Sequence, residues 1–158
     1  MSDYVAELRA ALEQAVPALL AIPEAQSARP RAPGKWSPKE VIGHLIDSAA
    51  VNHQRFVRAG SQDDLIFPTY PQDEWVAAQR YREAPWGELV ELWRGYNRHI
   101  ARVMEAVPDQ VRFRSHRRHN LHQIAWQVVP EGEPTTLDYL MRDYVGHLKH
   151  HLRQVLPD

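Results

Sequence analysis

The chain has 158 residues, of which 44% are hydrophobic and 25% charged, and this suits a single domain with a sizeable core over residues 1–158. Its net charge of -1 excludes a global basic field of the kind that binds nucleic acid or anionic membranes. There is no cysteine, so a metal site would have to use histidine, aspartate, glutamate or water. Because no apolar run approaches membrane-spanning length and no signal pattern is visible, we expect a cytoplasmic protein.

Two amphipathic helices are predicted in the first part of the chain. Apolar residues recur every three or four positions over residues 3 to about 21, which is typical of a helix with one buried face. A proline-containing loop follows. The second helix begins after the N-cap Ser37, with Pro38 at its first position and Glu40 completing a capping box, and runs to about Ala59.

The second predicted helix carries polar residues on or beside its apolar face. At about 100° per residue, His44 and Asn52 lie in or beside the apolar arc, and Asp47 lies on the polar side of His44. Arg55 lies near the same line as His44 and could meet an anionic substrate, but we expect a solvated arginine. A histidine on the core face requires an explanation.

Two long connections separate the second, third and fourth helices. Residues 61–84 form the first, with a short helix over about Gln72–Arg80, and the third long helix runs from about Pro85 to Val107. Residues 108–134 form the second, in which the apolar stretch Leu121–Val129 favours a short strand or an extended rim segment. Connections of this length are uncommon in compact domains and often line functional sites.

The second connection contains a basic, histidine-rich run between Arg112 and His122. His116, His119 and His122 recur every three residues, which could indicate a second metal site, and the nearby arginines could contact phosphate. We favour a solvated loop or a substrate rim. The net charge and the lack of interleaved aromatic residues argue against a nucleic-acid-binding face.

The fourth helix, from the N-cap Thr135 nearly to the C-terminus, contains the pattern His-x-x-x-His at His147 and His151. Residues four apart share a helix face, so these two imidazoles lie at or inside the apolar arc, whereas His150 faces solvent. Four long amphipathic helices, with long connections after the second and third, predict an all-α, four-helix bundle.

If the second and fourth helices are neighbours, His44, His147 and His151 can meet at one point. Three imidazoles leave coordination positions open, as in catalytic rather than closed structural sites, and they suit zinc, nickel, copper or iron. Hydrogen-bonded core histidines are the alternative, and spacing alone does not decide between the two.

Two segments resemble the motifs of a known family. Residues 34–48, GKWSPKEVIGHLIDS, are similar to the second-helix motif of DinB/YfiT-like proteins, and residues 143–154, DYVGHLKHHLRQ, are similar to their last-helix motif. The resemblance implies a four-helix bundle, often dimeric, in which three histidines bind a divalent metal, usually zinc or nickel. The matching positions here are His44, His147 and His151.

The resemblance implies an activity only in outline. Many members of this family are labelled metal-dependent hydrolases, and some relatives are thiol S-transferases that use bacillithiol or mycothiol. We therefore predict a metal-dependent hydrolase with a small-molecule substrate, and a thiol S-transferase or a non-catalytic metal-binding module as alternatives. Asp47 and Tyr144 are the candidate catalytic residues, although both also have a structural interpretation. We expect a homodimer that binds neither nucleic acid nor membranes.

Overall fold

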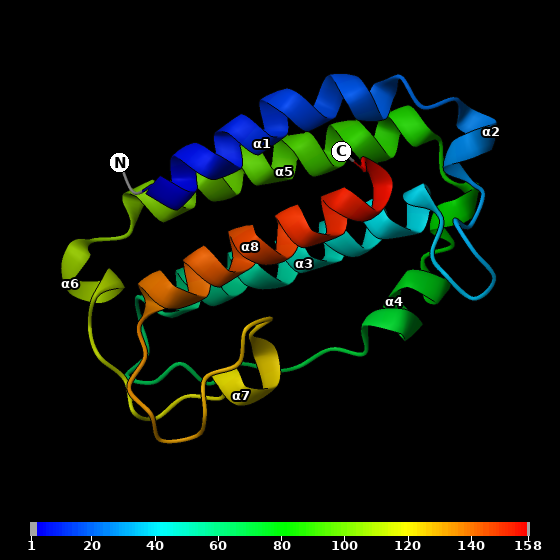
Figure 1. Ribbon diagram of the computed structural model, residues 1–158. Helices are drawn as coiled ribbons and strands as arrows, with labels where there is room; N and C mark the ends of the chain where they lie inside the picture. The colour runs from blue at the N-terminus through cyan, green and yellow to red at the C-terminus, as the bar shows by residue number, and fades with distance from the viewer. Residues whose placement is uncertain (1–2, 158) are drawn as a thin grey trace.

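The computed structural model describes residues 3–157, which form a bundle of four long helices (Figure 1). The long helices are α1 (Asp3–Leu20), α3 (Pro38–Arg58), α5 (Trp86–Ala106) and α8 (Leu137–Val155). Each packs against two others, in the cyclic order α1, α5, α3, α8. In Figure 1, α1 and α5 lie side by side in one layer, and α3 and α8 form the other. The predicted all-α four-helix bundle is confirmed.

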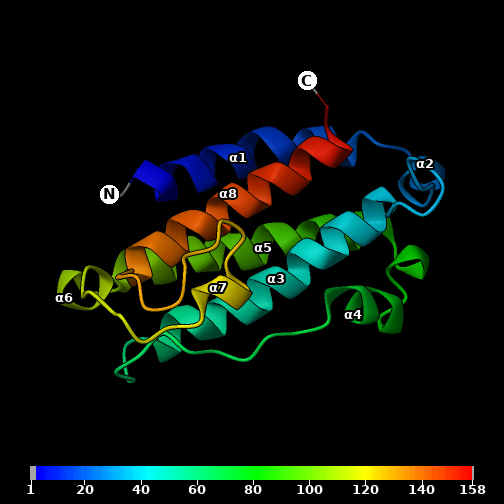
Figure 2. The ribbon, with the colours of Figure 1, turned by 60° about the horizontal axis from the view of Figure 1, so that its bottom comes forward.

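Short helices interrupt the connections between the long ones. They are α2 (Glu24–Ser27), α4 (Gln72–Ala78), the 3-10 turn η1 (Tyr81–Glu83), α6 (Asp109–Arg112) and α7 (Leu121–Ile124). The described part of the chain has no strand, and two isolated bridges, Leu65 with His119 and His116 with Thr135, join its extended segments. Both long connections run along the α3–α8 side of the bundle (Figures 1 and 2). They therefore cover the face formed by these two helices.

The inward faces of the four long helices form the hydrophobic core. Burial of one large apolar side chain stabilises the fold by about 1.5–3 kcal/mol. Within residues 3–157, no helix has both the length and the hydropathy that crossing a bilayer requires. The large side chains that are fully buried include Leu8, Leu45, Phe56, Trp93, Ile100 and Met104.

The start of α3 is fixed by its own side chains. The Ser37 N–H donates to the Glu40 carboxylate at 2.7 Å, and the Glu40 N–H donates to the Ser37 hydroxyl at 3.3 Å. This reciprocal capping satisfies two backbone donors that a helix otherwise leaves free. Pro38 fits the first position because a residue there needs no N–H donor. His44 thus lies about two turns into a helix with a well-defined start.

The first long connection is anchored to α3 by a close approach at Gly43. A β-carbon at Gly43 would lie 2.2 Å from the Tyr81 ring, so only glycine admits the ring at this position. Tyr81 then donates its hydroxyl proton to Asp47 at 2.7 Å, and Gln79 donates to the same carboxylate oxygen at 2.8 Å. This contact holds α4 and η1 against the helix that carries His44.

The N-cap of α8 is Thr136, and the prediction of Thr135 is wrong. The Thr136 hydroxyl accepts the Tyr139 N–H at 3.1 Å. Thr135 instead exchanges two backbone hydrogen bonds with His116, at 2.8 and 2.9 Å, and these hold it in the connection. Both threonines can cap a helix, and a contact distant in sequence decides between them.

The apolar stretch Leu121–Val129 begins with the helical turn α7, so a strand there is also wrong. Side chains satisfy its backbone donors. The Asp143 carboxylate accepts the N–H groups of Trp126 and Gln127, both at 2.8 Å, and Nδ1 of His119 accepts that of Leu121 at 3.1 Å. A segment whose N–H groups are already paired needs no neighbouring strand.

Candidate metal centre

Three histidines from two helices meet inside the bundle. His44 extends from α3, and His147 and His151 extend from successive turns of α8. One ring nitrogen of each lies within 4.8 Å of the others, and Nε2 of His44 is 3.3 Å from Nε2 of His147. The spacing of four residues on α8 and the packing of α8 against α3 produce this arrangement. The structure thus brings together the three predicted residues, whose role as metal ligands stays a prediction.

Burial keeps these imidazoles neutral. Loss of solvation, reinforced by the nearby His151, lowers the pKa of His44 to about 4. Burial and the neighbouring histidines lower the pKa of His147 to about 3, and burial also lowers the pKa of His151. At neutral pH each ring therefore has one nitrogen with a free lone pair, which is the form that binds metal ions.

The hydrogen bonds around the cluster suit a metal ion. Nδ1 of His151 lies 2.9 Å from Oε1 of Gln154, and because an amide oxygen only accepts, Nδ1 carries the proton and Nε2 the lone pair. Nδ1 of His44 is buried and has no partner in the described part of the chain. Within residues 3–157, Nε2 of His44 and Nε2 of His147 have no hydrogen-bond partner except each other. A divalent ion would bind the lone pairs that converge there. The residues present therefore fit such an ion.

Trp36 packs against the cluster. Its ring centroid lies 5.0 Å from that of His44 and 6.4 Å from that of His151. Trp36 directly precedes the N-cap of α3, so the same capping box that starts the helix also places the indole. His150 is exposed, as predicted, and its ring stacks at 5.3 Å from that of Trp126. The Trp36 indole thus shields part of the cluster from water.

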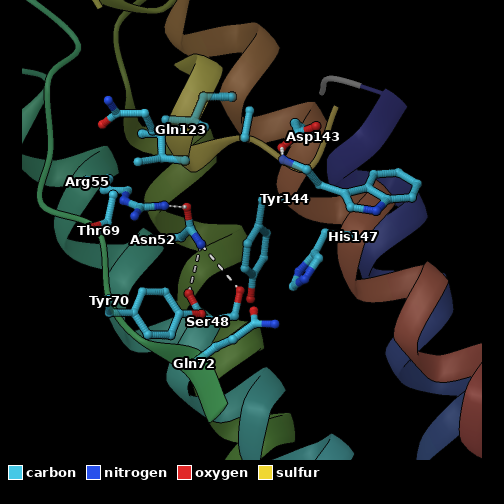
Figure 3. A pocket seen from close by; sticks show the side chains of 14 residues that line it. Ser48, Asn52, Arg55, Thr69, Tyr70, Gln72, Gln123, Asp143, Tyr144 and His147 are labelled. Carbon is cyan, nitrogen blue, oxygen red and sulfur yellow. Dashed lines mark hydrogen bonds between the residues drawn. The ribbon is translucent and has the colours of Figure 1, made fainter. Parts of the chain in front are cut away.

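A cavity of about 330 Å³ borders the cluster at His147 (Figure 3). Helix α3 contributes Ser48, Asn52 and Arg55 to its wall. Both long connections contribute as well, with residues 69, 70 and 72 from the first and residues 123–126 from the second. Both connections thus line a cavity, and its role as a functional site stays a prediction. A small molecule in this cavity would lie beside the histidine cluster.

Arg55 is buried in the cavity wall, and the expectation of a solvated arginine is wrong. Only 5% of the residue is exposed. Its Nη1 donates to Oδ1 of Asn52 at 3.3 Å, and its Nη2 donates to the Pro68 carbonyl at 3.1 Å. The chain after α3 folds back over the helix at Pro68, and this return removes the guanidinium from solvent.

The two candidate catalytic residues differ in position. Tyr144 lines the cavity, and its hydroxyl donates to Oδ1 of Asn97 at 2.5 Å. Burial raises the pKa of Tyr144, so the hydroxyl stays protonated. Asp47 does not line the cavity; its carboxylate accepts from Tyr81 and Gln79, and burial raises its pKa.

The basic run in the second connection is solvated only in part, because Arg114, Arg117 and Arg118 are exposed and three other members are buried. Arg112, His116 and His119 are each less than a tenth exposed. Arg112 donates to the Met104 carbonyl at 2.7 Å, which fastens the turn after α5 to the end of that helix. Among residues 3–157, one group of three potential metal-ligating side chains has converging ligand atoms, and it consists of His44, His147 and His151. His116, His119 and His122 do not form such a group.

Sequence reasoning missed two features of the site. The first is Gln154, whose amide oxygen accepts the Nδ1 proton of His151. Its position three residues after His151 on the same helix face is the sequence signal that indicates this contact. Thr69 and Tyr70 line the cavity from an irregular segment, and no local pattern indicates their place.

The fold and the cluster define a class of helical-bundle proteins with an internal histidine cluster between two neighbouring helices. The chain belongs to the DinB superfamily, whose family model matches residues 6–155. Among solved structures it is similar to YfiT from Bacillus subtilis, which is described as a probable metal-dependent hydrolase with an unusual four-helix bundle topology. The TM-score is 0.73 at 21% sequence identity, over 97% of this chain and 80% of that one. A search of curated proteins finds no match.

Proposed function

We propose that this protein is a metal-dependent hydrolase of a small-molecule substrate, with His44, His147 and His151 holding a zinc or nickel ion. The observation that carries the proposal is the convergence of three neutral imidazoles beside a cavity of about 330 Å³. When bound, a divalent ion supplies Lewis acidity and makes water nucleophilic near neutral pH. The description of YfiT as a probable metal-dependent hydrolase supports the same reaction class.

The residues around the cluster divide into those that reach the cavity and those that support it. Tyr144 reaches the cavity, and because its proton is donated to Asn97, its oxygen serves as a hydrogen-bond acceptor that orients the substrate. Asp47 acts through the scaffold as a positioning residue, since its carboxylate is held by Tyr81 and Gln79. Gln154 fixes the tautomer of His151.

Metal content and hydrolysis, measured on the same preparations, test this proposal. We expect about one metal ion per chain in the wild type and close to none in His44→Ala and His151→Ala, because each loses one of three ligands. His150→Ala is the matched control, since it removes an exposed imidazole next to His151 and should keep the ion. Unchanged metal content in His44→Ala and His151→Ala would refute the site.

The reaction class needs a second measurement. A panel of esters and amides should be cleaved by the metal-loaded wild type and His150→Ala, and not by the chelated protein or by His151→Ala. Turnover only in the presence of bacillithiol or mycothiol would favour a thiol S-transferase. Metal binding without turnover in any assay would refute both enzymes and favour the non-catalytic metal-binding module.

The homodimer and the cytoplasmic location expected from the sequence stay predictions. Light scattering at micromolar concentration tests the homodimer.

A further inference from the structure

Arg55 is a buried cation without an acidic partner. In the part of the chain that the structure describes, no carboxylate lies within 4.0 Å of its guanidinium. Its two hydrogen bonds go to neutral oxygens, those of Asn52 and Pro68, and its buried Nε has no partner. A guanidinium has five N–H donors, so most of its capacity is unused. An unpaired buried charge is costly in free energy, and a bound anion that pairs with it would offset this cost.

The cavity around Arg55 has one other charged residue in its wall, Asp143, which does not pair with the guanidinium. Both carboxylate oxygens of Asp143 already accept backbone N–H groups, from Trp126 and Gln127. Neutral polar side chains that also line the cavity include Asn52, Thr69 and Tyr70. The cavity therefore combines one available positive charge with neutral hydrogen-bonding groups, which suits an anionic group.

Arg55 and the histidine cluster lie at different ends of this cavity. On α3, His44 and Arg55 are three turns apart, about 16 Å of helix rise, and the long arginine side chain shortens that span. Figure 3 shows Arg55 and His147 on opposite sides of the space, with Tyr144 and Asn52 between them. A molecule held by Arg55 at one end can thus extend toward the cluster at the other.

We propose that the cavity binds a small carboxylate, with the carboxylate group on Arg55 and the rest of the molecule extending toward His147. The assignment of the His147 end as the reacting end rests on the proposed function. The planar guanidinium can pair with two oxygens of either a carboxylate or a phosphate, so the charge decides between them. A single cation matches the one negative charge of a carboxylate, whereas a phosphate dianion would keep one charge uncompensated.

Binding of hexanoate, compared with the neutral isostere hexanamide, tests the carboxylate site. Isothermal titration should be made with metal-loaded and with chelated protein, so that a carboxylate bound to the metal is recognised by its loss on chelation. We expect hexanoate to bind both forms at least about tenfold more tightly than hexanamide. Inorganic phosphate that binds more tightly than hexanoate, or equal affinity for hexanoate and hexanamide, would overturn the proposal.

Variants of two arginines on α3 locate the charge. Arg55→Met should abolish the preference for hexanoate, and Arg55→Lys should keep only part of it because lysine lacks the paired donors. Arg58→Met is the matched control, since it removes an exposed arginine one turn further along and should leave the preference unchanged. Metal content and thermal melting show whether Arg55→Met is folded, and Arg55→Lys decides the outcome if it is not. A preference unchanged in both Arg55 variants would refute the assignment.

A pair of esters separates this proposal from the hydrolase proposal. Mono-4-nitrophenyl adipate ends in a carboxylate, and its terminal amide has the same shape without the charge. We expect the wild type to cleave the charged ester at least about tenfold more efficiently in kcat/KM, and Arg55→Met to show a ratio near one. Hexanoate binding through Arg55 without cleavage of any ester or amide would refute the hydrolase and leave the carboxylate site. Equal cleavage of both esters, unaffected by Arg55→Met, would refute the carboxylate site and leave the hydrolase.

Discussion

His116 and His119 in the second connection differ in structural role from the three clustered histidines. Both rings are hydrogen-bonded through both nitrogens, whereas Nδ1 of the nearby His122 is buried and has no partner in the part of the chain that the structure describes. In His119, Nδ1 accepts the Leu121 N–H at 3.1 Å, so Nε2 carries the proton and donates to the Glu133 carbonyl at 2.7 Å. In His116, Nε2 accepts from Arg114 at 3.4 Å, and Nδ1 donates to the Asp63 carbonyl at 3.2 Å.

His44 precedes His147 and His151 by about a hundred residues in sequence, yet the three rings are close in space, with ring nitrogens directed at one another. The difference shows that a regular spacing of histidines in the sequence does not by itself bring their ring nitrogens together, and that hydrogen-bond partners tell which nitrogens are already occupied. A histidine whose two nitrogens are already paired has no lone pair to offer. Each of the clustered histidines keeps one ring nitrogen without a partner outside the cluster, and that nitrogen has a lone pair to offer.

Metal addition should give the largest difference between these two sets of histidines. A divalent ion at about a thousand times its Kd stabilises the protein that binds it by about 4 kcal/mol. We expect this increase in unfolding free energy for the wild type and for His119→Ala, and none for His44→Ala. Urea denaturation with metal and with chelator measures it. Loss of the increase in His119→Ala would show that the comparison is wrong.

Acid should destabilise the metal-free protein through the converging histidines. The folded state lowers the pKa of His44 to about 4 and that of His147 to about 3, while an unfolded histidine titrates near 6.5. The unfolded chain therefore binds more protons in this window, and the unfolding free energy falls as the pH falls below about 6.5. For His44 alone the loss at pH 4 is on the order of 3 kcal/mol.

The measurement is chelator-treated protein unfolded in urea across this pH range. His44→Gln is the matched variant, because it removes one titrating group from the cluster and should flatten the curve. If the unfolding free energy falls equally steeply with falling pH in His44→Gln and in the wild type, the prediction is contradicted.

In the metal-free protein, we expect truncation of a histidine in the second connection to cost more unfolding free energy than truncation of a clustered histidine. His119→Ala removes partners from the buried Leu121 N–H and from the Glu133 carbonyl, so we expect a loss of about 2 kcal/mol in unfolding free energy. His147→Ala in the chelated protein should cost less, since the ring lies beside an existing cavity and its removal ends the burial of an imidazole. Equal losses in both variants would weaken the distinction.

The long helices could be predicted from sequence because their signals are local. The apolar stripes place each long helix to within a few residues, and the capping box of Ser37 and Glu40 marks the start of α3. Two of the three clustered histidines share a helix face through their spacing alone. The third, His44, could be added only through its own core-facing position and the family resemblance.

The irregular segments could not be predicted, because contacts distant in sequence determine them. The Arg55 side chain is buried by the Pro68 carbonyl, and nothing in the α3 sequence indicates that the following connection returns over it. His116 and His119 are buried by backbone partners in two other segments, at Asp63 and Glu133. A helical pattern tells which face is apolar, and it does not tell what covers a polar residue beside that face.

The smallest expected effect concerns a hydrogen bond between the converging histidines and a side chain outside the cluster, which is the one such bond among residues 3–157. Gln154 accepts the Nδ1 proton of His151 and thereby leaves the Nε2 lone pair for a ligand. Gln154→Leu removes this acceptor while keeping a similar volume, so both tautomers of His151 become accessible. We expect metal affinity to fall about tenfold, the lower end of the effects that such supporting contacts have. Gln154→Glu keeps an acceptor and should bind metal at least as tightly as the wild type in a chelator competition titration. Equal affinities for Gln154→Leu and the wild type would mean that helix packing alone orients the ring.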